Sequence, residues 1–198
     1  DHHHFPAAMM AVKRGKHVYV EKPLTHSVGE ARALRAEARK RGIVSQMGNQ
    51  GHATEGIRLM KEWVDADVIG EVREVHAWSP TFGDHYFVRP ATLPLPAQMP
   101  PETLNWDLWL GPAAERPYHE SIIPERWRGW WNFGNGMLGD WACHTLDAPF
   151  WALDLGAPTS VEVEVSEVNP EISPLWAELT YRFPARGNRP PVTLKWFE

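Results

Sequence analysis

The apolar positions near the start of the chain predict two helices that alternate with two strands. The first helix has apolar residues at helical spacing and ends before a glycine: Phe5, Ala8, Met9, Val12 and Gly15. The β-forming run 17–20 follows it. Ser27 and Glu30 form the capping box of a second helix, which ends at Gly42, and the run 44–47 predicts the next strand. This order is typical of βαβ units, in which helices cover a parallel sheet.

The second predicted helix and the segment after it carry regular apolar stripes. The stripe of the second helix consists of Val28, Ala31, Leu34 and Ala38. Thr54 can cap a third helix, which carries Ile57, Met60 and Val64, and the run 71–79 predicts a strand. From Pro80 to Phe133 no period is sustained. A connection of that length in a compact domain is typical of a binding loop or lid.

The last third of the chain alternates between apolar and polar residues. Apolar residues occupy every second position in the runs 161–165, 175–183 and 192–196. This alternation predicts half-buried strands of an antiparallel or mixed sheet with one wet face. The whole chain is therefore expected to be α/β plus α+β: residues 1–51 form a parallel-sheet domain, and residues 52–198 form an α+β domain with a largely antiparallel open sheet.

Three loops of the first domain are expected to meet at one edge of its sheet. The segments Asp-His-His-His at 1–4, Glu-Lys-Pro at 21–23 and Gly-Asn-Gln-Gly at 48–51 each follow a strand or precede a helix. The carboxyl ends of parallel strands share one edge, and ligands of open α/β sheets bind outside that edge. The charged pair Glu21–Lys22 is therefore placed where a cofactor or substrate would bind.

Composition narrows the class of protein. The formal net charge of −5 gives no basic face for a nucleic acid. No apolar run approaches the roughly 20 residues that span a bilayer, so no membrane partner is expected. The single cysteine, Cys143, fits a reducing compartment without proving one. The compartment stays open, with the cytoplasm favoured and the periplasm an alternative if a leader precedes Asp1.

The chain contains eleven tryptophans, several of them in the segments 105–112 and 125–136. Indole rings combine apolar area with a polar group, so they serve equally in a core or in a site for a sugar. Sequence alone leaves the two interpretations open. Trp127, Arg128 and Trp131 are the residues of this region that we expect to contact a substrate.

A glycine-rich turn at 134–139 leads into a helix with two contrasting sides. Asp140, His144 and Asp147 lie on one side, and Leu138, Ala142, Leu146 and Phe150 lie on the other, while Pro149 should bend or restart the helix. The polar side is either a solvated face or part of a site. A metal site is the rival hypothesis, but no third ligand stands at a diagnostic spacing, so no metal is predicted.

Two motifs carry a family resemblance. The run GKHVYVEKPL, followed about a hundred residues later by GNGMLGDWACHTLD, resembles the Gfo/Idh/MocA family of NAD(P)-dependent oxidoreductases. The family pairs a Rossmann domain, one strand of which ends in Glu-Lys-Pro, with an α+β substrate domain that carries an Asp-x-x-x-His helix. The resemblance covers nearly the whole chain in order. It implies NAD or NADP as cofactor and a carbohydrate-like substrate.

The resemblance assigns roles to matching positions. Lys22, Asp140 and His144 would be catalytic, with His144 as general acid/base on the substrate hydroxyl and Asp140 as its orienting or substrate-binding partner. The residues implied on the cofactor side are Asp1, His2, His4, Glu21, Lys22, Pro23, Asn49 and Gln50, with a cis bond as one way for Pro23 to shape that edge. The substrate side would consist of Lys22, Trp127, Arg128, Trp131, Asp140 and His144.

Elementary chemistry agrees with these roles. Removal of hydride from a secondary alcohol gives a carbonyl only if the hydroxyl proton also departs, so a base is needed beside that carbon. Histidine suits this task near neutral pH. A lysine in a closed site beside the cationic oxidised nicotinamide should have its charged form disfavoured, which lets it share the proton or hydrogen-bond the developing oxyanion.

The chain departs from the family pattern at the nucleotide-binding motif, which limits the dinucleotide binding that we expect. The glycines at 48 and 51 do not form GxGxxG, so the nucleotide fingerprint is absent from these 198 residues. We therefore expect the chain to be a fragment, truncated also near Glu198, that binds a dinucleotide poorly by itself. Two alternatives to a dehydrogenase stay open: an NAD-dependent glycoside hydrolase that works by transient oxidation, and a non-catalytic sugar-binding protein. The intact protein is expected to be a dimer or tetramer.

Overall fold

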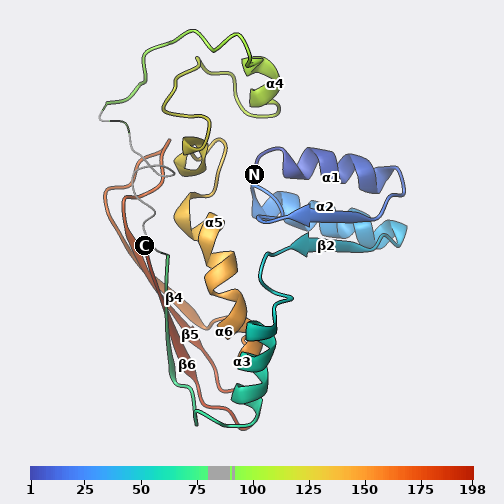
Figure 1. Cartoon of the computed structure of the whole chain (residues 1–198), viewed down its shortest axis with the longest axis vertical. Coiled ribbons are helices and arrows are strands. Elements are labelled where there is room, and N and C mark those ends of the chain that lie inside the picture. Colours follow the sequence, from blue (N-terminus) through green and yellow to red (C-terminus); the bar gives the residue numbers. More distant parts are fainter. Residues whose placement is uncertain (80–89, 91) are drawn as a thin grey trace. The chain divides into compact units, whose positions relative to one another are not determined.

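The computed structural model describes residues 1–79, 90 and 92–198, which fall into two compact units (Figure 1). The first unit comprises residues 1–48, the described residues between 90 and 140, and the segment 169–173. The second unit comprises the described residues of 49–79 together with 141–168 and 174–198. The fold class is the expected one: a parallel α/β element is followed by an α+β arrangement with a mixed sheet.

The N-terminal part of the first unit is a βαβ element preceded by a helix. In chain order its elements are α1 (His4–Lys13), β1 (Val18–Glu21), α2 (Val28–Arg41) and β2 (Ser45–Gly48). The strands β1 and β2 pair in parallel, with Glu21 opposite Gly48. The core between helices and strands is apolar and is centred on Ala8, Val12, Leu34 and Ala38. The predicted alternation of helices and parallel strands is confirmed.

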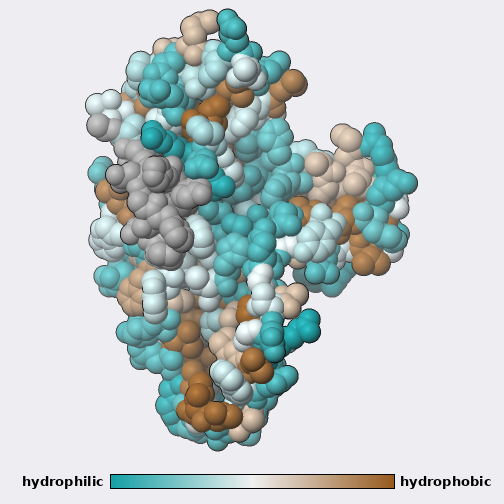
Figure 2. Space-filling view, viewed as in Figure 1, coloured by the Kyte–Doolittle hydropathy of each residue, from teal (hydrophilic) through white to brown (hydrophobic). Residues whose placement is uncertain are grey.

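The ends of α2 follow the sequence prediction, but one residue of its stripe does not. The Glu30 amide donates to Ser27 Oγ at 3.2 Å, and the Ser27 amide donates to Glu30 Oε2 at 2.9 Å, which completes the capping box. Gly42 ends the helix with a φ of 65°. Val28 is 68% exposed, because it stands in the first turn before the stripe reaches the core. Figure 2 shows apolar residues on the surface of this βαβ part.

The aperiodic region forms a core of its own within the first unit. It contains the short helix α4 (Trp106–Leu110) and the 3-10 helix η2 (Arg126–Gly129). The buried residues of this core are Leu110, Ile122, Trp130, Phe133 and Ile172, and Trp106, Trp109 and Trp127 pack against it. Trp130 is thus a core residue, whereas the other three are only partly buried, and the substrate contact of Trp127 stays a prediction. The part of the predicted loop at 80–89 and 91 lies outside the described residues.

The second unit is built on a four-stranded mixed sheet with the order β3–β6–β5–β4. Its strands are β3 (Glu74–Trp78), β4 (Ser160–Val165), β5 (Ala177–Phe183) and β6 (Val192–Phe197). The strand β3 pairs with β6 in parallel, and the remaining pairs are antiparallel. Residues of α3 (Glu55–Asp65) and the end of α6 (Asp147–Ala152) pack with β5 and β6 around a core centred on Leu153, Leu155, Phe183, Val192 and Leu194.

Three details of this unit differ from the sequence prediction. Val161 and Val163 of β4 are 46% and 56% exposed, because β4 is an edge strand that the apolar core does not reach. Thr54 precedes α3, but its hydroxyl donates to the Gly51 carbonyl at 2.7 Å instead of capping the helix. Phe150 is 41% exposed although it belongs to the predicted apolar side, because the helix ends and restarts before it.

Among the described residues, no helix has the length and apolar character needed to cross a membrane.

Candidate active site

Lys22 stands immediately beyond the carboxyl end of β1. Its backbone amide donates to the Gly48 carbonyl at 2.9 Å, which extends the ladder between β1 and β2 by one bond. The Lys22–Pro23 peptide bond is cis, the arrangement that the sequence left open for Pro23. The charged pair Glu21–Lys22 therefore lies where the parallel strands end, as the sequence predicts.

The side chain of Lys22 binds Asp140, which lies 118 positions later in the chain. The amine Nζ donates to Asp140 Oδ1 at 2.5 Å and to the Asp140 backbone carbonyl at 2.7 Å. Arg128 approaches the other carboxylate oxygen, with its Nε 3.4 Å from Oδ2. Two cations thus flank one carboxylate, and all three side chains belong to the first unit.

This cluster is largely shielded from water. The side chains of Lys22 and Asp140 are 16% and 11% exposed, and that of Arg128 is 26% exposed. The transfer of charges into a protein interior is costly unless each is paired and hydrogen-bonded. The interpretation of Asp140 as part of a solvated helix face is therefore wrong. The arrangement is one in which a fixed ammonium group can serve as a hydrogen-bond donor.

The turn before Asp140 is held by close packing. A side chain at Gly134 would place its Cβ 2.4 Å from the Arg128 carbonyl oxygen, so only glycine fits there. Two residues of the turn also form hydrogen bonds with the N-terminal segment. His26 Nε2 donates to the Gly134 carbonyl at 3.2 Å, and Asn135 Nδ2 donates to Asp1 Oδ2 at 3.3 Å. The tight turn brings Arg128 close to the helix α5 (Gly136–Thr145), on which Asp140 stands.

His144 lies one helical turn after Asp140 on α5. Its ring meets that of Trp141 edge to face, with 5.8 Å between the ring centroids, and the residue is partly buried. The helix ends at Thr145, and Asp147 begins α6, so the predicted restart near Pro149 is confirmed. Asp147 accepts a hydrogen bond from His52, which the sequence did not single out.

The histidines of the N-terminal segment have partners in the protein. His2 is 7% exposed, and its ring packs against those of Trp109 and Phe133. Its Nε2 donates to the Trp109 carbonyl at 3.3 Å, and burial together with the neighbouring His3 lowers the pKa of His2 to about 4. His4 Nδ1 donates to the Pro23 carbonyl at 2.6 Å. The roles of these residues toward a cofactor stay predictions.

The remaining cofactor candidates follow the ends of β1 and β2. Glu21 is exposed, and its carboxylate lies so near Gly48 that a Cβ there would be 2.9 Å from Oε1. Asn49 Nδ2 donates to the Cys143 carbonyl at 2.8 Å, whereas its Oδ1 is buried and has no hydrogen-bond partner among the described residues. Gln50 is exposed.

Of the predicted substrate residues, Trp127 supports Arg128. The Arg128 guanidinium lies over the Trp127 ring, 4.6 Å from its centroid, and its Nη1 donates to the Glu125 carbonyl at 3.1 Å. Trp131 is 38% exposed and donates from Nε1 to the Asn169 carbonyl at 3.2 Å. Trp127 therefore orients the cation beside Asp140, and Trp131 is the residue of this pair that presents a large ring face to solvent.

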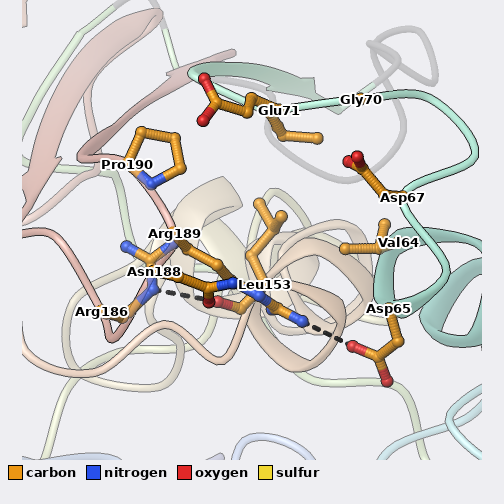
Figure 3. A pocket seen from close by; sticks show the side chains of 11 residues that line it. Val64, Asp65, Asp67, Gly70, Glu71, Leu153, Arg186, Asn188, Arg189 and Pro190 are labelled. Atoms are coloured by element: carbon orange, nitrogen blue, oxygen red, sulfur yellow. Dashed lines mark hydrogen bonds and ion pairs between the residues drawn. The ribbon is translucent and has the colours of Figure 1, made fainter.

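A cavity of about 310 Å³ in the second unit lies among none of the predicted site residues (Figure 3). Figure 3 shows Arg189 directed toward Asp65, at 2.5 Å, and Arg186 directed toward the Leu153 carbonyl, at 3.0 Å. Burial lowers the pKa of Arg186. Both guanidinium groups join the loop between β5 and β6 to the ends of α3 and α6, which is a structural task.

The sequence singled out neither His26 nor Arg116, whose contacts hold the turn and the core of the first unit. His26 holds Gly134, and Arg116 lies over the Trp130 ring at 4.6 Å while pairing with Glu171 at 3.0 Å. No local pattern marks either residue, because their partners lie elsewhere in the chain and are brought to them only by tertiary packing. By contrast, Lys22 and Asp140 belong to motifs that the sequence displays.

Comparison with known families identifies the class of protein to which the chain belongs. Residues 1–49 match the model of an oxidoreductase family's NAD-binding Rossmann fold, and residues 54–188 match the model of that family's C-terminal alpha/beta domain. The chain therefore belongs to the Gfo/Idh/MocA family of oxidoreductases, and its first residues are part of that family's NAD-binding domain.

Individual relatives are distant. The chain is 26% identical over 167 residues to the uncharacterized oxidoreductase YdgJ of Escherichia coli K12, covering 84% of this chain and 37% of that protein. An aldose-aldose oxidoreductase from Caulobacter crescentus, complexed with glycerol, superposes with a TM-score of 0.65 at 19% identity, over 98% of this chain and 47% of that one. The WlbA dehydrogenase from Bordetella pertussis, in complex with NADH and UDP-GlcNAcA, gives 0.61 at 16% identity, over 97% and 48%. The chain thus spans less than half the length of these relatives.

Proposed function

We propose that the protein is an NAD(P)-dependent dehydrogenase that transfers hydride between the cofactor and a hydroxyl-bearing carbon of a sugar, polyol or sugar derivative. The observation that carries this proposal is the shielded contact of Lys22 with Asp140, flanked by Arg128. Such a cluster supplies fixed donors and a fixed acceptor for vicinal hydroxyl groups. The choice of substrate class is supported by the UDP-GlcNAcA bound to one structural neighbour and by the name of another, an aldose-aldose oxidoreductase.

The residues of this chain fit part of a dinucleotide. Asn49 directly follows β2, and its buried Oδ1 has no partner in the described part of the chain, so a ribose hydroxyl would supply a donor to it. The family resemblance implies that Lys22 also contacts the nicotinamide ribose. No GxGxxG turn is present in residues 1–49, so these residues do not account for the pyrophosphate. The fit therefore concerns the ribose end of the cofactor.

The chemistry divides between the cofactor and the chain. When bound, the nicotinamide exchanges hydride with the substrate carbon. The imidazole of His144 takes the hydroxyl proton in oxidation and returns it in reduction. The ammonium group of Lys22, held by the Asp140 carboxylate, donates a hydrogen bond to the substrate oxygen as negative charge develops there. Arg128 keeps the Asp140 carboxylate oriented from its other oxygen.

The proposal extends to assembly as a homo-oligomer, a dimer or tetramer, through the open sheet. Trp78 of β3 is paired with Phe197 and lies on the sheet face opposite that of the buried Leu194, and its side chain is 62% exposed. A large apolar side chain exposed on the face of an open sheet is typical of a protein interface. Light scattering on the full-length protein, compared with a Trp78→Glu variant, tests this part.

The activity test uses the full-length protein with NAD or NADP and a panel of aldoses, polyols and nucleotide sugars. We expect cofactor reduction with at least one of them. In K22M and H144A turnover should fall by about 100-fold or more, the effect expected when a general base or oxyanion donor is removed. Cleavage of aryl glycosides with no net cofactor reduction would identify a hydrolase instead. Activity that survives both substitutions would contradict the assignment of the site.

A further inference from the structure

The segment that follows β2 contacts the helices on either side of His144. Asn49 Nδ2 donates to the Cys143 carbonyl at 2.8 Å, and His52 Nδ1 donates to Asp147 Oδ2 at 2.8 Å. The His52 ring also faces that of Trp151, with centroids 5.2 Å apart. Because all of these residues belong to the second unit, the contacts are internal to one compact body.

The two hydrogen bonds bracket His144 in the sequence. Cys143 directly precedes it near the end of α5, and Asp147 is the first residue of α6. The last carbonyls of a helix have no amide partner within that helix, so bonds from outside define how the last turn ends. At the junction between the helices, the Leu146 amide donates to the Ala142 carbonyl at 2.8 Å, and the Leu146 carbonyl accepts from the Phe150 amide at 2.9 Å. The segment 49–52 adds one hydrogen bond just before His144 and one just after it.

We propose that His52 is a positioning residue that, through Asp147, fixes the α5–α6 junction and with it the imidazole of His144. This inference rests on the proposed function, in which His144 moves the substrate proton. His52 acts through the helix junction and takes no part in the proton transfer itself.

The energetics favour a geometric effect over a stabilising one. The side chain of His52 is 49% exposed and that of Asp147 is 19% exposed. A pair this exposed contributes only about 0–1 kcal/mol to folding. A misplacement of about 1 Å at a catalytic group, by contrast, can lower a rate by up to about 100-fold. The loss of this contact should therefore be visible in turnover and nearly invisible in folding stability.

Three variants of the full-length protein separate these effects. H52F keeps an aromatic ring beside Trp151 and removes the donor to Asp147. H52N restores a donor at the position of Nδ1 and removes the ring. H76F is the matched control, since His76 is also an exposed histidine hydrogen-bonded to an acidic side chain, Glu74, but on the strand β3.

We expect H52F to lower turnover on the order of 10-fold with the KM for the dinucleotide unchanged. H52N should recover most of the loss, and H76F should match the wild type. The decisive variant is H52F combined with H144A: its turnover should equal that of H144A alone, because residues that act as one unit are not additive. Asp147→Ala repeats this comparison from the partner's side if H52F does not fold.

The outcomes distinguish this inference from the proposed function. An H52F enzyme with wild-type turnover, beside an inactive H144A, would overturn the positioning role and leave the proposed function standing. A further loss when H52F is added to H144A would also overturn it, because His52 would then act independently of His144. Full activity in H144A would overturn the proposed role of His144 and the positioning role together.

Discussion

Lys22 Nζ lies 2.5 Å from Asp140 Oδ1, and so the end of a parallel strand is joined to the middle of the helix α5, 118 positions later. Both groups are mostly shielded from water, and Arg128 shares the carboxylate. A pair of this kind specifies geometry as much as it stabilises, because either partner left alone would be a poorly solvated charge. The following predictions start from this cluster and from the packing that supports it.

Loss of the carboxylate should cost more stability than loss of the amine. D140A leaves Lys22 and Arg128 as two cations without their shared partner, and we expect a loss of about 3–5 kcal/mol. K22M leaves Arg128 to pair with Asp140, so its cost should be smaller, about 1–3 kcal/mol. Chemical denaturation of the full-length variants measures both. The reverse order would show that Arg128 does not share the carboxylate.

The exposed pair of Arg182 and Glu162 provides the control for that experiment. Its side chains are 50% and 62% exposed, with 3.1 Å between Arg182 Nη2 and Glu162 Oε2. R182Q should change the free energy of unfolding by less than about 1 kcal/mol. A large effect of R182Q would mean that shielding is not what distinguishes the two pairs.

Gly134→Ala should disturb the site through the backbone. The added Cβ would meet the Arg128 backbone at 2.4–2.8 Å, so the turn must move, and we expect a destabilisation of about 1–3 kcal/mol together with reduced turnover. Gly56→Ala is the matched control, because Gly56 stands in α3 and, outside its own helix, no described residue lies within 4 Å of the added Cβ. That variant should be stabilised by up to about 1 kcal/mol. Equal effects at the two glycines would contradict the argument.

Stability should fall as the pH drops from about 6.5 toward about 4, in part because of His2. Its folded-state pKa is lowered to about 4 by burial and by His3, so in this range the unfolded chain binds a proton that the folded protein does not. The contribution is complete above pH 6.5 and amounts to at most about 3 kcal/mol.

The variant H2Q tests the contribution of His2, since glutamine retains a donor for the Trp109 carbonyl and does not titrate. Urea unfolding at pH 7 and pH 4.5 should show a smaller difference for H2Q than for the wild type. An unchanged difference would assign the pH dependence to other groups.

Two adjacent tryptophans should behave in opposite ways. Trp130 is fully buried in the core of the first unit, and W130A should cost about 3–5 kcal/mol. Trp131 is 38% exposed, and W131A should cost less than about 1.5 kcal/mol while raising the KM for the sugar substrate. Unfolding and steady-state kinetics on the same preparations check both. A stable W130A would place that ring outside the core.

The local elements of the fold were predictable because their determinants are short-range. The capping box of Ser27 and Glu30, the glycine that ends α2 and the alternation along β6 each specify an element from neighbouring residues alone. The burial of the edge strand β4 was predicted wrongly, because short-range determinants do not show which strand lies at the edge of a sheet. Its alternation is that of a half-buried strand, but burial of Val161 and Val163 requires a partner layer that local sequence does not describe.

The sequence by itself determined the order of helices and strands and the two family motifs, since these depend on local spacing, and through the family resemblance the motifs marked Lys22, Asp140 and His144 as candidates. Only the tertiary structure decided that Asp140 is shielded and shared between Lys22 and Arg128, and that Trp127 and Trp130 pack into a core. The physical reason is that these contacts join residues far apart in the chain, and their burial depends on what the whole fold places around them.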